Sequence, residues 1–133
     1  MRVLRIAGTV LLWTLQVLAA AGFIAIGLAK FGSPAWARNF ARWGYPGGFY
    51  MVIGALEVIG GALLLIPRLT SYAAALLGTI MVAAAATLLL HNETAHLSAP
   101  LAWLGMLIVL GAARRRRAWR PASRPLPIAA SQV

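Results

Sequence analysis

The stretch that decides the fold reads FYMVIGALEVIGGALLLI and occupies residues 49–66. It is apolar throughout except for Glu57, and it approaches the roughly 20 residues that a helix needs to cross the hydrocarbon of a bilayer. A carboxylate placed at mid-span costs roughly 2.5–3.5 kcal/mol on insertion scales. We therefore expect Glu57 to face neighbouring helices, where it can be paired, and not the lipid.

Three further stretches avoid charge in the same way, namely residues 6–29, 71–90 and 97–113. The chain of 133 residues is 62% hydrophobic and only 11% charged, whereas a soluble domain carries roughly 25% charged residues. We predict an all-α protein, a four-helix transmembrane bundle that forms one membrane domain over residues 1–113. A basic, proline-containing tail over residues 114–133 follows it, and we expect disorder at the end of this tail.

The positive charges predict the orientation of the bundle. Nine of the twelve would lie on one side of the membrane, and three on the other. The richer side usually faces the cytoplasm, which places both termini in the cytoplasm and the protein in a bacterial-type inner membrane. The nine are Arg2, Arg5, Arg68 and the six arginines after Ala113, against Lys30, Arg38 and Arg42.

The beginning of the chain has a second interpretation. Residues 1–21 resemble a secretory signal, with two arginines, an apolar run and a small-residue cleavage site. The apolar run continues past these alanines to Ala29, however, which is longer than a signal requires. This length favours an uncleaved membrane anchor.

Composition excludes several classes of function. The sequence has no cysteine and no aspartate, which rules out a disulfide scaffold, a thiolate metal site and a hydrolase or kinase. No metal site is predicted, because the two histidines of loop 91–96 are five residues apart. The net charge of +10 does not indicate nucleic-acid binding, since half of the positive charges follow the last span. We expect the run Arg114, Arg115, Arg116 and Arg117 to contact anionic lipid headgroups.

The connection between the first two spans predicts a short amphipathic helix over residues 34–43. Its aromatic rings share one helical face and its guanidinium groups lie nearly opposite. This pattern is typical of a helix in the outer membrane interface, as an anchor or as a lid over a cavity. The rings are Trp36, Phe40 and Trp43, and the charges are Arg38 and Arg42.

Glycines surround Glu57 on its own helix. Gly54, Gly60 and Gly61 lie three or four residues away, so that one face of the span lacks side chains. A neighbouring helix, through a residue such as Gly27, or a small ligand can then approach the carboxyl group closely. The glycine pattern is compatible with both a functional and a purely structural role for Glu57.

Four polar residues are candidate partners or ligand contacts. Gln16 and Lys30 lie on the first span, and Lys30 can turn inward or extend outward to the interface, of which we favour the second. Thr79 on the third span has nearly the depth of Glu57, and it can bond either Glu57 or its own preceding turn. We expect Tyr45 to line the outer mouth of a cavity with Lys30.

The third span also carries small residues at four-residue spacing. Ala74, Gly78, Thr79, Ala83 and Thr87 follow this pattern, which permits close helix packing. The contact is expected within the bundle, and a homodimer is the alternative.

Four phrases together resemble the DoxX-like family of small four-span membrane proteins, over about residues 6–111. The resemblance implies a four-helix bundle and an association with membrane redox systems, including quinone-linked ones. The cysteines by which similar bundles reduce quinones are absent here, so that mechanism is not implied. The phrases are Gly27-Leu-Ala-Lys-Phe31, Trp43-Gly-Tyr-Pro46, Gly54-Ala-Leu-Glu-Val-Ile-Gly-Gly61, and Pro67 with Tyr72-Ala-Ala74.

Three functional hypotheses follow. The first is a small subunit or accessory of a quinone-linked redox system, with redox partner proteins and a cavity beside Glu57 for a quinone headgroup. The second is a small proton-coupled transporter of apolar molecules. The third is a structural membrane scaffold in which Glu57 forms a packing contact.

Overall fold

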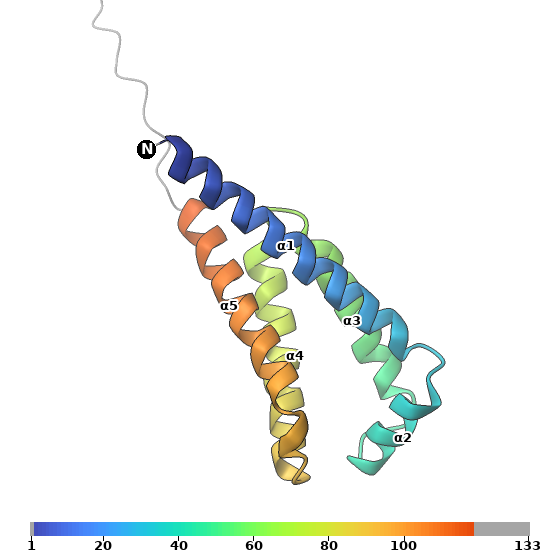
Figure 1. The fold of residues 1–133 in the computed structure, drawn as a ribbon. Coiled ribbons are helices and arrows are strands. Elements are labelled where there is room, and N and C mark those ends of the chain that lie inside the picture. Colours follow the sequence, from blue (N-terminus) through green and yellow to red (C-terminus); the bar gives the residue numbers. More distant parts are fainter. Residues whose placement is uncertain (1, 119–133) are drawn as a thin grey trace, which may run out of the picture.

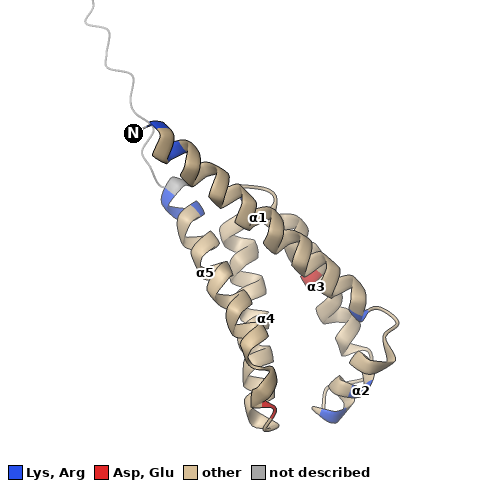
Figure 2. Ribbon diagram, viewed as in Figure 1, with Lys and Arg blue, Asp and Glu red and all other residues tan. Residues whose placement is uncertain are grey.

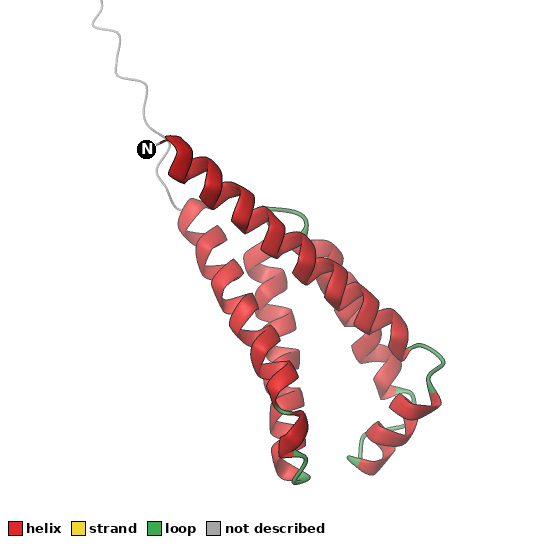
Figure 3. Ribbon diagram, viewed as in Figure 1, coloured by secondary structure: helices red, strands yellow, loops and turns green. Residues whose placement is uncertain are grey.

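The computed structural model describes residues 2–118 of the chain, and the side chains of residues 2–116. Helices and short connections make up this part, which contains no strand (Figure 3). The helices are α1 (Arg2–Lys30), α2 (Pro34–Arg42), α3 (Phe49–Leu64), α4 (Thr70–Leu90) and α5 (Ser98–Ala118), with a single 3₁₀ turn, η1 (Thr94–His96), before α5. The prediction of an all-α protein is confirmed.

The four long helices form two antiparallel pairs. Helix α1 packs along α3, α4 packs along α5, and contacts of α3 with α4 and of α1 with α5 join the pairs (Figure 1). The start of α1 and the end of α5 lie at one end of the bundle, and α2 lies at the other (Figure 1). We call these the basic end and the α2 end.

Three segments are long and apolar enough to cross a membrane: α1, α4 and Thr94–Arg116, which contains η1 and most of α5. Helix α3 has 16 residues, about 24 Å at 1.5 Å per residue, against a hydrocarbon core of about 30 Å. It begins after Gly48, whose φ of 80° is left-handed, and ends two residues before the predicted limit at Ile66. A full crossing by α3 therefore stays a prediction, as does the cytoplasmic orientation.

Burial differs from that of a water-soluble protein, although an apolar core that includes Phe23, Leu64 and Leu77 is present. Large apolar side chains are exposed, among them Val3, Leu4 and Leu90. The polar and charged side chains that are buried are Gln16, Lys30, Glu57, Thr70, Thr87 and Arg114. Such residues are seldom buried in water-soluble folds, and the exposed apolar side chains on all four long helices match a lipid surrounding.

The ends of α1 and α5 differ from the predicted spans. Helix α1 is continuous through the alanines of the possible cleavage site, and Ala19 and Ala20 are buried in the core. Whether this segment is an uncleaved anchor or a cleaved signal stays a prediction. Helix α5 continues through Ala118, so that the first residues of the predicted tail belong to a helix. The expected disorder falls on residues 119–133, which lie outside the described part of the chain.

Candidate functional site

A buried ion pair joins α1 to α3. Lys30 Nζ, at the last residue of α1, lies 2.6 Å from Glu57 Oε2, in the middle of α3. The two side chains are only 4% and 2% exposed. The prediction that Glu57 faces other helices is confirmed, whereas the outward extension of Lys30 is wrong. An inward lysine satisfies a carboxylate that would otherwise be buried alone, which is far more costly than burying the pair.

Helix α2 closes over the lysine. Lys30 Nζ lies 4.4 Å from the centre of the Trp36 ring, a cation–π contact. The local sequence determines this position, because Ser33 caps the helix by accepting a hydrogen bond from the backbone N–H of Trp36, and Pro34 occupies the first turn. Lys30 thus has an anionic partner on α3 and an aromatic one on α2.

The glycines near Glu57 are points of helix contact. A Cβ on Gly27 would lie 2.6 Å from the backbone oxygen of Gly54, and one on Gly54 would lie 2.8 Å from that of Gly27. A Cβ on Gly60 would meet the Leu77 side chain at 2.7 Å, and one on Gly61 the backbone oxygen of Ala20 at 3.0 Å. The predicted close approach is therefore made by α1 and α4, and a ligand that reaches Glu57 has to displace part of this packing.

Thr79, the expected partner of Glu57, and Tyr45, expected at the outer mouth of a cavity, make other contacts. Thr79 is exposed and donates a hydrogen bond to the Ala75 carbonyl one turn earlier, at 2.8 Å, so the alternative of bonding its own helix is the correct one. Tyr45 bonds the hydroxyl of Thr87 on α4 and stacks on Phe49.

Gln16 belongs to a second buried cluster, toward the basic end. Its amide donates to the Leu64 carbonyl at 2.5 Å and to the Thr70 hydroxyl at 3.2 Å. Arg114 donates to the amide oxygen of Gln16 from Nε at 2.9 Å, and its guanidinium carbon lies 4.8 Å from the centre of the Trp13 ring. This cluster satisfies the carbonyl of Leu64, the last residue of α3, and ties α5 to α1.

The lipid-headgroup prediction is therefore wrong for Arg114. Its side chain is 9% exposed and points into the bundle, because the buried oxygen of Gln16 requires a donor. Arg115 and Arg116 are exposed, as expected, and the side chain of Arg117 lies outside the described part.

Replacing Arg114 by methionine should lower the free energy of unfolding by roughly 1–2 kcal/mol, because it leaves the buried oxygen of Gln16 without this donor. Arg116→Met is the matched control and should change stability by less than about 0.5 kcal/mol. Thermal unfolding of both variants in the same detergent measures the difference. Equal effects would contradict the inward role of Arg114.

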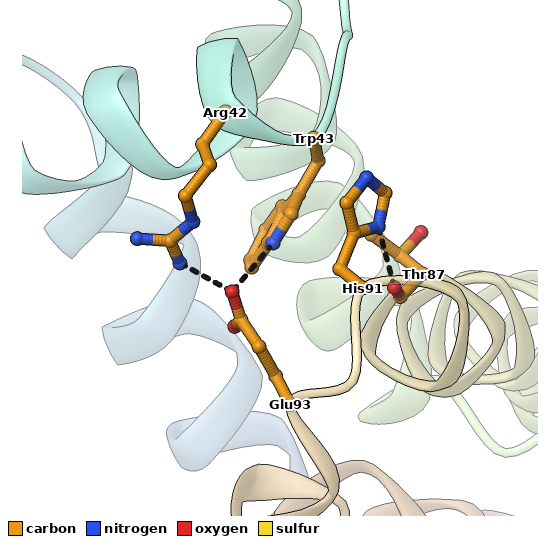
Figure 4. Close-up of polar contacts among 5 residues, drawn as sticks. All are labelled: Arg42, Trp43, Thr87, His91 and Glu93. Atoms are coloured by element: carbon orange, nitrogen blue, oxygen red, sulfur yellow. Dashed lines mark hydrogen bonds and ion pairs between the residues drawn. The ribbon is translucent and has the colours of Figure 1, made fainter.

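A polar clasp connects the two helix pairs at the α2 end. Glu93 Oε1 lies 2.7 Å from a guanidinium nitrogen of Arg42 and accepts a hydrogen bond from the Trp43 indole at 3.3 Å (Figure 4). His91 Nδ1 lies 2.8 Å from the Thr87 carbonyl oxygen (Figure 4). Loop 91–96 is therefore a polar contact loop, and in the described part no three His, Cys, Asp or Glu residues gather to hold a metal.

Helix α2 has the predicted two faces. Phe40 is buried, Trp36 and Trp43 are half-buried, and Arg38 and Arg42 are exposed. Phe40 packs against the ring of Tyr45, in the turn between α2 and α3, and against the ring of Phe49, the first residue of α3. The helix thus covers the end of the α1–α3 pair and reaches the loop after α4 through the clasp, and whether it serves as an anchor or as a lid stays a prediction.

The small residues of α4 only partly face the rest of the bundle, since Ala74, Gly78 and Thr87 are buried whereas Thr79 and Ala83 are exposed. A Cβ on Gly111 of α5 would meet the Cβ of Ala74 at 3.3 Å, and one on Gly78 would meet the Leu104 side chain at 3.6 Å. The expected packing of α4 against another helix of the bundle is confirmed at Ala74 and Gly78 and not at Thr79 or Ala83, and homodimer formation stays a prediction.

The sequence predicted the inward direction of Glu57 and the two faces of α2, and it offered Lys30 and Gln16 as candidates. It did not predict the inward turn of Lys30, the contact of Gln16 with Arg114 or the role of Glu93. The only available signal was that each of these side chains is polar beside an apolar span. Arg114 and Trp43 lie 98 and 50 residues from their partners Gln16 and Glu93 in the sequence, and no local pattern connects such distant positions.

Comparison with known proteins identifies the family. A family model described as the DoxX-like family matches residues 14–111, which include the ion pair, α2 and the clasp. No curated protein and no solved structure matches the chain. The match spans most of the chain and agrees with the resemblance of its sequence phrases. This apolar, all-helical chain is therefore a membrane protein that belongs to the DoxX-like family.

Proposed function

We propose that this protein is a small subunit or accessory of a quinone-linked membrane redox system, and that the Lys30–Glu57 pair receives the quinone headgroup. The observation that carries the proposal is the complete ion pair inside a bundle whose outside is apolar. A buried ion pair can often be replaced by apolar residues without loss of stability. Ionisable residues at membrane depth are accordingly more typical of functional sites than of packing.

The chemistry of the pair suits a quinone. The ammonium group of Lys30 can donate a hydrogen bond to a quinone carbonyl, and the carboxylate of Glu57 can accept one from the hydroxyl of the reduced form. Trp36, which now covers Lys30, offers an aromatic face for the quinone ring. The ligand would enter from the α2 end by displacing part of this cover.

The test is quinone binding in lipid nanodiscs. A short-chain quinone should quench the tryptophan fluorescence of the natural protein saturably. Glu57→Gln should weaken binding of the quinol, measured by its competition with the quinone, about tenfold through loss of a charged acceptor. Glu93→Gln is the matched control, because it changes the other glutamate of the chain, in the clasp, and should leave binding unchanged. Equal binding by both variants would overturn the proposal.

A structural scaffold is the second candidate. It is favoured by the glycines around Glu57, because α1 and α4 already pack against them. The double variant Lys30→Met/Glu57→Met separates the two roles. A scaffold tolerates this exchange and keeps its fold and its redox partners, whereas a quinone site loses its ligand. The transporter hypothesis has less support, because Lys30 already neutralises the carboxylate that would exchange protons.

A further inference from the structure

A groove of about 630 Å³ runs along the outer surface between α4 and α5. Its walls are mostly small or apolar, since alanine and glycine residues such as Ala75, Gly78 and Ala112 leave space between the two helices. Ser71 and Arg115 line the end of the groove toward the basic end, and Val82 and Leu104 line the other. None of its lining residues belongs to the ion pair or to the clasp.

The length of the groove corresponds to one leaflet of a bilayer. From Ser71 to Val82 it follows α4 for about 16 Å at 1.5 Å per residue. The hydrocarbon core is about 30 Å thick, so a single leaflet contributes about 15 Å. A lipid acyl chain spans one leaflet, whereas a helix from a second copy would continue through both. The dimensions therefore favour an acyl chain.

Charge distinguishes the two ends of the groove. Arg115 is exposed and has no carboxylate partner among residues 2–116, unlike Arg42 at the opposite end of the bundle. The arginines at the start of α1 and at the end of α5 gather at the same end (Figure 2). A ligand with an apolar chain in the groove would thus place its polar head beside unpaired positive charge.

We propose that this groove is a binding site for an anionic phospholipid, with one acyl chain between α4 and α5 and the phosphate at Arg115. The site lies apart from the Lys30–Glu57 pair and does not depend on the quinone proposal. It also gives Arg115 a role different from that of Arg114, which points inward to Gln16. The bound lipid would fill a gap that the small residues leave on the membrane-facing surface.

Native mass spectrometry of the full chain in detergent tests the proposal, with phosphatidylglycerol and phosphatidylcholine as probes. One phosphatidylglycerol per chain should be retained, and phosphatidylcholine should be retained at least about fivefold less. Arg115→Gln should remove most of this preference, by about fivefold, whereas Arg116→Gln, in the same turn but outside the groove, should not.

A second pair of variants tests the groove itself. Ala112→Leu fills it and should lower retention of both lipids, whereas Ala102→Leu changes an equally exposed alanine of α5 that does not line it. Unfolding temperatures verify that both variants fold. If Ala112→Leu does not fold, the lipid preference of Arg115→Gln tests the proposal alone. Equal retention of the two lipids, or a lipid-free dimer that Ala112→Leu dissociates, would overturn the proposal.

Discussion

Replacing Glu57 with alanine is expected to lower the free energy of unfolding by about 3–5 kcal/mol. The variant leaves the ammonium group of Lys30 buried between α1 and α3 without its anion, and the Trp36 ring alone does not compensate for the lost carboxylate. Denaturant or thermal unfolding in one detergent measures the change, with helical circular dichroism as the signal.

Two comparisons make this result specific. Glu93→Ala breaks the other ion pair, in which Arg42 is 57% exposed, and should cost no more than about 1 kcal/mol. The double variant Lys30→Met/Glu57→Met removes both buried charges and should recover most of the stability lost in Glu57→Ala. If Glu57→Ala were no more harmful than Glu93→Ala, the pair would not be buried as described.

Replacing Gly27 with leucine is expected to cost about 3 kcal/mol, at the upper end for an overpacked contact. The obstacle is backbone, because the new Cβ would lie 2.6 Å from the Gly54 carbonyl oxygen, which cannot rotate aside. Helices α1 and α3 must separate, and the separation also strains the Lys30–Glu57 contact one turn away.

Gly8→Leu is the control for this variant. It lies in the same helix, and nothing is within 4 Å of the position that its Cβ would take. It should leave stability unchanged or raise it slightly, since leucine favours a helix more than glycine does. Similar losses for Gly8→Leu and Gly27→Leu would contradict the close crossing of α1 and α3.

Much of the fold follows from the sequence because the membrane imposes strong rules. Apolar runs bounded by glycine, proline and charge predicted the helices to within a few residues, except at the end of α5. The cost of a carboxylate in lipid predicted the inward direction of Glu57. The spacing of Trp36, Phe40 and Trp43 predicted the buried face of α2.

The pairing of side chains across the bundle could not be predicted in this way. Lys30 stands at the end of its span, where a lysine can extend outward at little cost. It turns inward because the Gly27–Gly54 contact brings α1 so close to α3 that a Cβ on Gly54 would lie 3.1 Å from the Cβ of Lys30. Only the three-dimensional crossing of the two helices contains this information.

The arginines after Ala113 show the same limit. Four consecutive arginines are equivalent as a charge pattern, and all four were expected at the lipid headgroups. The rotation of α5 turns Arg114 toward Gln16 and leaves Arg115 and Arg116 exposed. Which arginine points inward depends on the packing of α5 against α1, and the apolar residues of α5 do not reveal that rotation.

The most direct test of the central claim is the distance between Lys30 Nζ and the Glu57 carboxylate in a lipid bilayer. The chain has a single lysine and two glutamates, so solid-state NMR on protein with ¹⁵N in the lysine side chain and ¹³C in the glutamate carboxylates is free of ambiguity from other lysines. We predict nitrogen–carbon dipolar coupling to one carboxylate carbon, because its oxygen lies 2.6 Å from Lys30 Nζ, and loss of this coupling in Glu57→Gln. Absence of coupling in the natural protein would contradict the buried pair and the proposals that depend on it.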